Sequence, residues 1–123
     1  MRILLADDHA VVRRGLEMVL GLEKDFQIVG DAANGEEAIA QARRLSPDLV
    51  LLDVKMPRLD GIAAARAIRK NSPRTRILML TGIEVGNEIV QALEAGADGY
   101  VLKEVSPEEL IHAIRVIGAG EAY

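Results

Sequence analysis

The sequence has 123 residues, of which 50% are hydrophobic and 28% are charged, and its formal net charge is -4 at pH 7. This length suits one domain of ordinary size, and the acidic balance argues against a module that itself binds DNA. Cysteine is absent, which excludes disulfides, thiolate chemistry and cysteine-ligated metal sites and fits a reducing compartment.

Five short apolar runs are spread along the chain. They are rich in isoleucine, valine and leucine, and we expect a strand over each of them: Ile3–Ala6, Ile28–Gly30, Leu49–Leu52, Ile77–Leu80 and Tyr100–Leu102. Because the runs are continuous rather than alternating, they indicate strands that are buried on both faces, as in a parallel sheet.

A segment with the spacing of an amphipathic helix follows each run. The predicted apolar stripes are Val12, Leu16, Val19 and Leu20; Ala38, Ile39, Ala42 and Leu45; Ile62, Ala65 and Ile68; Ile89, Val90 and Leu93; and Leu110, Ala113, Ile114 and Ile117. We expect Asn34, Asp60 and Ser106 to cap the starts of three of these helices. Gly96 and Gly118 are expected to end two of them in left-handed conformations.

Strands and helices thus alternate five times along the chain. This alternation predicts an α/β fold with a parallel sheet and helices on both faces, because each right-handed crossover carries the chain back to the same end of the sheet. A closed barrel of eight such units needs about 250 residues. We therefore expect an open, doubly wound sheet.

Charged or hydroxyl-bearing residues end four of the five predicted strands. Asp7 and Asp8 follow the first strand, Asp53 ends the third, Thr81 ends the fourth and Lys103 ends the fifth. In open parallel sheets, ligands bind beyond the carboxyl ends of the strands. These side chains are therefore expected to lie together at one edge of the sheet and to form the functional site.

Three carboxylates and one ammonium group would leave this edge with an excess of negative charge. Mg²⁺ would offset that charge, since it accepts carboxylates, a backbone carbonyl, waters and phosphate oxygens as ligands. A carboxylate can also attack phosphorus and form an acyl phosphate, and this transfer depends mainly on positioning and charge neutralisation. The cluster therefore predicts magnesium-dependent phosphoryl chemistry.

The same elements resemble the receiver domains of two-component response regulators. The matching segments span essentially the whole chain: Asp7-Asp8, Leu51–Pro57 followed by Asp60-Gly61, Leu80–Gly82 and Gly99–Lys103. The resemblance implies a flavodoxin-like receiver fold, a doubly wound five-stranded parallel sheet in the order 2-1-3-4-5.

The resemblance also implies which residues act on the phosphoryl group. Asp53 matches the phosphoacceptor, and Lys103 matches the lysine that contacts the phosphoryl group. Thr81 and Tyr100 match a switch pair, in which the threonine turns toward the phosphoryl group and the aromatic ring follows it inward.

A second set of roles concerns the cation. Asp8 and Asp53 match side-chain ligands of Mg²⁺, and Asp7 matches a residue that acts mainly through water. The backbone carbonyl of Lys55 matches a further ligand. Mg²⁺ is the cofactor that the resemblance implies.

Segments such as Asp7-Asp8-His9, Ala33–Ala38 and Ser106–Leu110 resemble the NarL/FixJ-like branch of the family, which carries a LuxR-type helix-turn-helix output domain. We therefore expect residues 1–123 to be a receiver domain whose C-terminal DNA-binding output domain is absent from this chain. The expected partners are a sensor histidine kinase and, after phosphorylation, a second copy. DNA would be contacted only through the missing output domain. Val11, Ile111 and Val116 are candidate partner contacts.

The expected location is the cytoplasm. The longest apolar runs, such as Ile77–Leu80, are too short to cross a bilayer, and the aspartates at positions 7 and 8 argue against a signal peptide. His9 and Arg13 are expected on the solvated surface.

Three alternatives remain beside a receiver that controls transcription. The first is a stand-alone receiver that acts by binding another protein. The second is a phosphatase with an aspartyl-phosphate intermediate, but such enzymes usually carry a second aspartate where this chain has Lys55. The third is a flavin-binding protein, which the 2% aromatic content makes a poor fit. We expect no enzyme in the usual sense, but a signalling domain that catalyses only its own phosphorylation and dephosphorylation.

Overall fold

The computed structural model describes residues 1–82 and 86–121, and its centre is a parallel sheet of five strands. The order across the sheet is β2-β1-β3-β4-β5, as predicted. The strands are β1 (Arg2–Ala6), β2 (Gln27–Ala32), β3 (Leu49–Asp53), β4 (Arg76–Thr81) and β5 (Gly99–Leu102).

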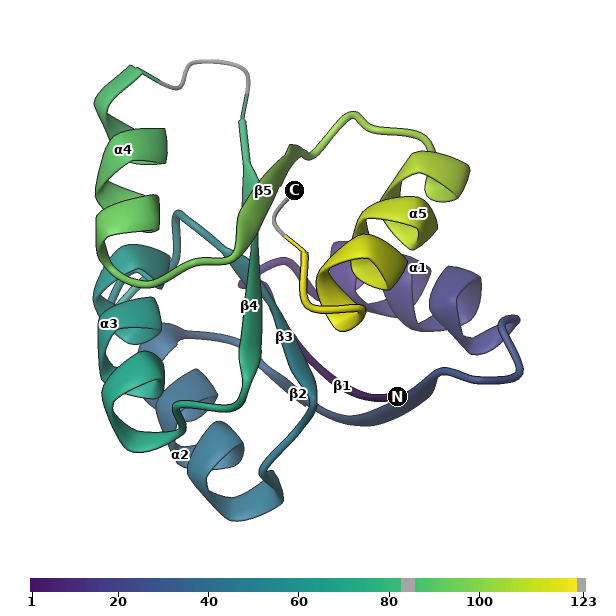
Figure 1. The fold of residues 1–123 in the computed structure, drawn as a ribbon, viewed down its shortest axis with the longest axis horizontal. Helices are drawn as coiled ribbons and strands as arrows, with labels where there is room; N and C mark the ends of the chain where they lie inside the picture. Colours follow the sequence, from purple (N-terminus) through teal and green to yellow (C-terminus); the bar gives the residue numbers. More distant parts are fainter. Residues whose placement is uncertain (83–85, 122–123) are drawn as a thin grey trace.

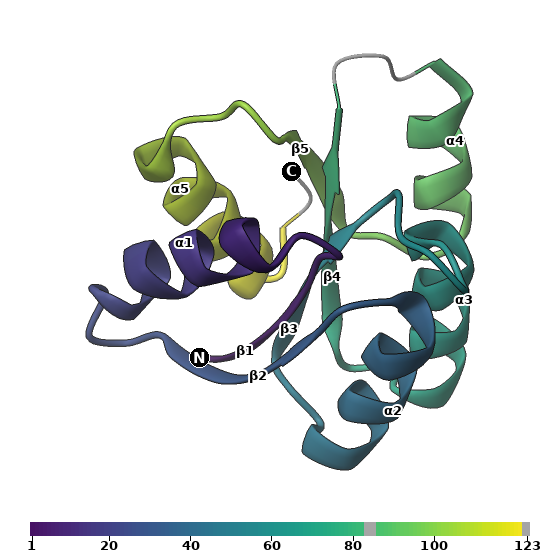
Figure 2. The same ribbon diagram turned by 180° about the vertical axis from the view of Figure 1, so that it is seen from behind.

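Helices cover both faces of this sheet and form a three-layer arrangement. They are α1 (Ala10–Gly21), α2 (Gly35–Leu45), α3 (Gly61–Asn71), α4 (Gly86–Glu94) and α5 (Pro107–Gly118). Figure 1 shows α1 and α5 on one face and α2, α3 and α4 on the other, and Figure 2 shows the same layers from behind. The predicted α/β fold is confirmed.

Each face of the sheet has its own apolar core. Neighbouring strand residues point to opposite faces, so Ile3 and Leu5 pack toward α1 and α5, whereas Leu4 and Ala6 pack toward the other three helices. β1, β3 and β4 are almost entirely buried, while the edge strand β2 is mostly half-exposed. This double burial explains why the central strands appear as continuous apolar runs in the sequence.

The three predicted helix caps are present. Asn34 Oδ1 accepts a hydrogen bond from the Glu37 amide at 2.9 Å, and Asp60 Oδ1 accepts one from the Ala63 amide at 2.8 Å. Ser106 Oγ accepts one from the Glu109 amide at 3.1 Å. Each cap pairs an amide that the first helical turn cannot satisfy.

One of the two predicted helix ends is wrong. Gly96 follows α4 with a φ of 110°, as expected, but Gly118 is still the last residue of α5. The left-handed residue is Gly120, with a φ of 91°. Its amide donates to the Ile117 carbonyl at 2.9 Å, so the left-handed turn after the helix lies two residues later than predicted.

Candidate functional site

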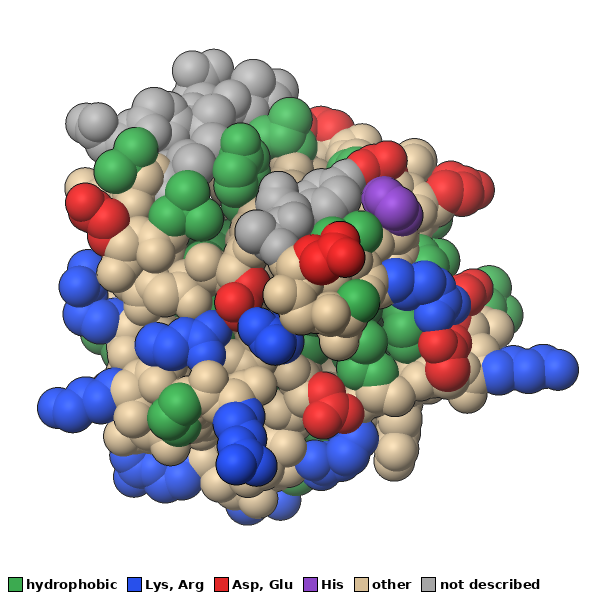
Figure 3. Space-filling model, viewed as in Figure 1, with side chains coloured by type: hydrophobic (Ala, Val, Ile, Leu, Met, Phe, Trp, Pro, Cys, Tyr) green, Lys and Arg blue, Asp and Glu red, His purple; other side chains and the backbone are tan. Residues whose placement is uncertain are grey.

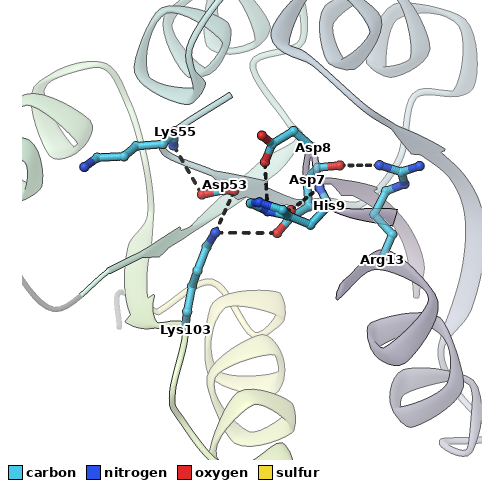
Figure 4. A network of polar contacts seen from close by, with 7 residues as sticks. All are labelled: Asp7, Asp8, His9, Arg13, Asp53, Lys55 and Lys103. Carbon is cyan, nitrogen blue, oxygen red and sulfur yellow. Dashed lines mark hydrogen bonds and ion pairs between the residues drawn. The ribbon is translucent and has the colours of Figure 1, made fainter. Parts of the chain in front are cut away.

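The carboxyl edge of the sheet gathers the polar residues that end the strands. Asp7 and Asp8 follow β1, Asp53 ends β3, Thr81 ends β4, and Lys103 follows β5. The register pairs Ala6 with Leu52, Asp53 with Leu80 and Thr81 with Leu102, so the strand ends lie side by side. Figure 4 shows the side chains of Asp7, Asp8, Asp53 and Lys103 converging on one point.

Lys103 reaches two buried carboxylates from its position after β5. Its Nζ lies 2.8 Å from Asp53 Oδ2 and 3.9 Å from Asp7 Oδ2. Asp53 and Asp7 are each only 1% exposed. Because burying an unpaired charge is costly, the lysine is the main group that makes this acidic cluster tolerable in the described part of the chain.

The pKa values at this edge reflect burial and charge together. Burial raises the pKa of Asp53, the charge of Asp7 raises it further, and the hydrogen bonds from Lys103 and the Lys55 amide only partly oppose this. Burial acts to lower the pKa of Lys103, but its hydrogen bond to Asp53 and the nearby carboxylates outweigh burial and raise it. The folded protein therefore disfavours the charged form of Asp53 while it favours the charged form of Lys103.

Several buried polar atoms of this cluster have no hydrogen-bond partner among the described residues. They include Asp7 Oδ2, Asp8 Oδ1 and the Thr81 hydroxyl oxygen. Buried polar atoms are nearly always paired in folded proteins. These atoms are therefore free to bind a ligand that brings positive charge or hydrogen-bond acceptors.

The loop after Asp53 is held against the site by a close backbone approach. The Lys55 amide donates to Asp53 Oδ1 at 3.2 Å, and Figure 4 shows the Lys55 side chain pointing away from the cluster. A Cβ atom on Gly61 would collide with the backbone carbonyl of Asp53. Only glycine therefore fits where α3 begins.

Tyr100 lies away from the charged cluster, on the same sheet face as Thr81. Tyr100 pairs with Met79 in the register, two residues before Thr81, and residues two apart on a strand share a face. The ring is half-buried against the core beneath α2, α3 and α4. The structure thus brings the predicted switch residues onto neighbouring strands, while the switch itself stays a prediction.

Two residues beside the carboxylates were expected only on the solvated surface. Arg13 has an 18% exposed side chain, and its Nη1 donates to the Asp7 carbonyl oxygen. His9 is 64% exposed as expected, yet its Nδ1 lies 3.1 Å from Asp8 Oδ1 and 3.3 Å from Asp7 Oδ1. Their positions in the sequence could have indicated these contacts, because His9 directly follows Asp7-Asp8 and Arg13 lies one helical turn after His9.

Comparison with known proteins identifies the family. The family model for the response regulator receiver domain matches residues 3–115 of this chain. The response regulator VraR of Staphylococcus aureus is 40% identical over 122 residues, which cover 99% of this chain and 58% of VraR. This chain therefore spans little more than half the length of that relative.

Solved structures agree with this match. A LuxR-family response regulator from Aurantimonas sp. superposes with a TM-score of 0.93 at 39% identity, covering 98% of this chain and 86% of that one. The receiver domain of the putative regulator NarL from Mycobacterium tuberculosis gives a TM-score of 0.93 at 32% identity, covering 98% and 97%.

None of the helices in the described ranges has the length and apolar character needed to span a bilayer.

Three observations agree on the family of this chain: the sheet order, the cluster of acidic residues at the carboxyl edge of the sheet, and the similarity along almost the whole sequence. The chain belongs to the receiver domains of two-component response regulators, in the NarL/FixJ-like branch with the LuxR-type regulators.

Proposed function

We propose that Asp53 accepts a phosphoryl group from a sensor histidine kinase and that the modified domain then passes on the signal. The observation that carries this proposal is the Lys103 Nζ at 2.8 Å from a carboxylate that is 1% exposed, beside Asp7. A buried acid with a cation in contact and a shifted pKa is a common feature of reactive sites.

The transfer needs one bond to form and one to break. A carboxylate oxygen of Asp53 attacks phosphorus, the bond from phosphorus to the donor's imidazole nitrogen breaks, and the electron pair stays on the imidazole. Lys103 offsets the negative charge of the transferred group. The Thr81 hydroxyl is 2% exposed, has no hydrogen-bond partner within residues 1–82 and 86–121, and is available to donate to a phosphoryl oxygen.

The residues present fit a divalent cation. Asp7 Oδ2 and Asp8 Oδ1 are buried oxygens without hydrogen-bond partners in the described part of the chain, where three carboxylates face the ammonium group of Lys103. We propose that Asp8, Asp53 and the Lys55 carbonyl bind Mg²⁺ directly and that Asp7 does so through water. The bound cation would supply positive charge for the carboxylates and the phosphoryl oxygens.

Phosphorylation would change the surface near α4 and β5. It replaces one negative charge on Asp53 with about two and adds acceptor oxygens, so Thr81 would turn toward them and Tyr100 would repack. Val90, Leu93 and Leu102 are exposed apolar residues in this region, and Figure 3 shows hydrophobic side chains gathered over α4 and β5. A shift between two packings would alter this surface without changing the fold.

The relatives support a proposal for the whole protein. Since the chain spans 58% of VraR, we propose that it is the receiver part of a transcription regulator whose DNA-binding domain lies outside residues 1–123. Phosphorylation would promote a homodimer that places two such domains on DNA. The site of action would be the cytoplasm, where histidine kinases expose their phosphorylated domains.

The test is phosphorylation by a small donor. Incubation with acetyl phosphate and Mg²⁺ should add one phosphoryl group to the wild-type protein and to Asp25→Asn, an exposed control, but none to Asp53→Asn. Intact-protein mass spectrometry measures the addition, and excess chelator should abolish it. Equal labelling of Asp53→Asn would refute the assignment of the acceptor. Rapid release of many equivalents of phosphate would instead favour a phosphatase.

A further inference from the structure

We propose that His9 supplies a nitrogen ligand to the cation held by Asp7, Asp8 and Asp53. The site would then bind a first-row transition-metal cation more tightly than its carboxylates alone would. This inference rests on the cation site of the proposed function, but it concerns a residue and a class of cation outside that proposal.

The first argument is position. One potential ligand atom from each of Asp7, Asp8, His9 and Asp53 lies within 4.8 Å of all the others. The imidazole Nδ1 is 3.1 Å from Asp8 Oδ1 and 3.3 Å from Asp7 Oδ1. Figure 4 shows the ring of His9 between these two carboxylates rather than directed away from them.

The second argument is the state of the carboxylate oxygens. Asp7 is 1% exposed, yet its Oδ2 accepts no hydrogen bond from the residues that the structure describes. Asp8 Oδ1 accepts none from them either, despite the 3.1 Å approach of the imidazole. Buried oxygens without partners are costly. A cation bound between these oxygens and the ring nitrogen would remove that cost.

The third argument excludes the most obvious structural role. His9 is the N-cap residue of α1, a position whose side chain often accepts a hydrogen bond from the first turn. Its side chain makes no such bond. The backbone amide of His9 donates to Asp7 Oδ1 at 2.8 Å, which fixes where the ring starts. The ring instead lies within hydrogen-bond distance of Asp7 Oδ1, at 3.3 Å, and so faces the acidic cluster.

Accessibility also favours a ligand role. Asp7 and Asp53 form the buried floor of the cluster, whereas the Asp8 and His9 side chains are 28% and 64% exposed. A cation can therefore enter from solvent past these two residues. Solvent would complete its coordination.

The chemistry of the donor atoms determines the class of cation. Mg²⁺ prefers oxygen ligands and keeps several waters, so an added nitrogen contributes little to its binding. Imidazole suits the later first-row cations, including Co²⁺, Ni²⁺ and Zn²⁺. His9 should therefore act on selectivity between cations, more than on the presence of a site.

Isothermal titration calorimetry with Mg²⁺ and with Co²⁺ separates this role from a structural one. His9→Ala should weaken Co²⁺ binding by about tenfold or more and Mg²⁺ binding by less than about twofold. His112→Ala, which removes the other histidine of the chain, should change neither. A histidine that only orients the carboxylates would weaken both cations equally, and that result would overturn the inference.

Direct coordination has its own signature. In protein labelled with ¹⁵N-histidine, Zn²⁺ should shift the Nδ1 resonance of His9, identified by its loss in His9→Ala, and leave that of His112 in place. An unchanged His9 resonance in protein that binds Zn²⁺ would refute ligation. If the wild-type protein binds neither Mg²⁺ nor Co²⁺, and Asp8→Asn behaves identically, the cation site of the proposed function fails instead.

Discussion

The amino and carboxyl edges of the sheet differ in how their polar side chains are paired. At the amino edge, Asp98 Oδ2 accepts from the Ile77 amide and from Arg69 Nη2, both at 2.8 Å, and the Thr75 hydroxyl donates to the Pro47 carbonyl at 3.0 Å. At the carboxyl edge lie all four buried side-chain atoms that lack a hydrogen-bond partner within the described ranges: Asp7 Oδ2, Asp8 Oδ1, Arg13 Nε and Thr81 Oγ1. Arg13 Nε keeps an ion pair with Asp31 Oδ2 at 3.4 Å.

This difference separates two uses of polar groups in one sheet. Paired groups at the amino edge stabilise the fold, because each partner replaces a hydrogen bond that water made in the unfolded chain. Unpaired groups at the carboxyl edge cost stability and leave atoms free for ligands, as is common at functional sites. Substitutions at the two edges should therefore differ in their effects on stability.

The tightest point of the carboxyl edge is a backbone contact rather than a side chain. Gly61→Ala should lower the free energy of unfolding by roughly 3 kcal/mol, because the new methyl group collides with the Asp53 carbonyl. Gly15→Ala is the matched control, since nothing lies within 4 Å of its Cβ position on α1. It should raise stability by about 0.5 to 1 kcal/mol. Urea unfolding measures both, and equal effects would contradict the packing argument.

The stability of the fold should depend strongly on Asp98 at the amino edge of the sheet. Asp98→Ala leaves the Ile77 amide without its acceptor and removes the carboxylate paired with Arg69, which keeps only the Gly96 and Pro73 carbonyls. This loss should cost about 2 kcal/mol of unfolding free energy. The folded fraction should still take up a phosphoryl group at the wild-type rate, because the change lies at the opposite end of the sheet. Slower labelling by acetyl phosphate at equal folded fraction would show that the two edges are not independent.

Asp53→Asn should raise the free energy of unfolding, whereas Asp98→Ala should lower it. Burial and the charge of Asp7 raise the pKa of Asp53 above its ordinary value of 3.8, so its charged carboxylate destabilises the folded state once the pH exceeds the folded-state pKa. The variant should therefore be more stable than the wild-type protein at neutral pH in the presence of chelator. As the pH falls through the folded-state pKa toward 3.8, the wild-type carboxyl takes up its proton and the advantage should disappear. Thermal unfolding across this range measures it, and a constant difference would refute the assignment.

Substitution of Asp25 should have the smallest effect on stability, and its dependence on pH should be the reverse of that for Asp53. Its hydrogen bond with Arg115 lowers the pKa of this exposed carboxyl below 3.8, so the pair stabilises the folded state above that value. Asp25→Asn should lower the melting temperature slightly at neutral pH, and the difference should vanish as the pH falls through the lowered pKa. High salt should reduce it too. A difference that survives in strong acid would mean that charge is not its cause.

Much of this molecule could be predicted from local patterns. Strand runs such as Leu49–Leu52 are continuous because both sheet faces are covered, and caps such as Asn34 depend on neighbours three residues away. The cluster at the carboxyl edge could be predicted because parallel strands end at the same side. The family resemblance added the sheet order, which the comparisons and the structure confirm, and the roles of Thr81 and Tyr100, which stay predictions.

Other features depend on hydrogen bonds that hydrophobic spacing does not reveal. Arg13 has the sequence context of a solvated helix residue, yet the packing of α1 brings it to the Asp7 carbonyl. The left-handed turn after α5 falls at Gly120, since Ala119 still donates to the Arg115 and Val116 carbonyls. Neither choice is visible in a hydrophobic pattern, because the pattern records burial and not hydrogen-bond partners.

Residue type and spacing were enough to predict the α/β alternation, the parallel sheet and the acidic residues at its carboxyl edge, because burial and strand polarity follow from them. The folded structure was needed to learn which of their oxygens lack a hydrogen-bond partner among the described residues and that the ring of His9 lies beside them. Those outcomes depend on distances of a few ångströms between chain segments, which side-chain packing sets and local sequence does not encode.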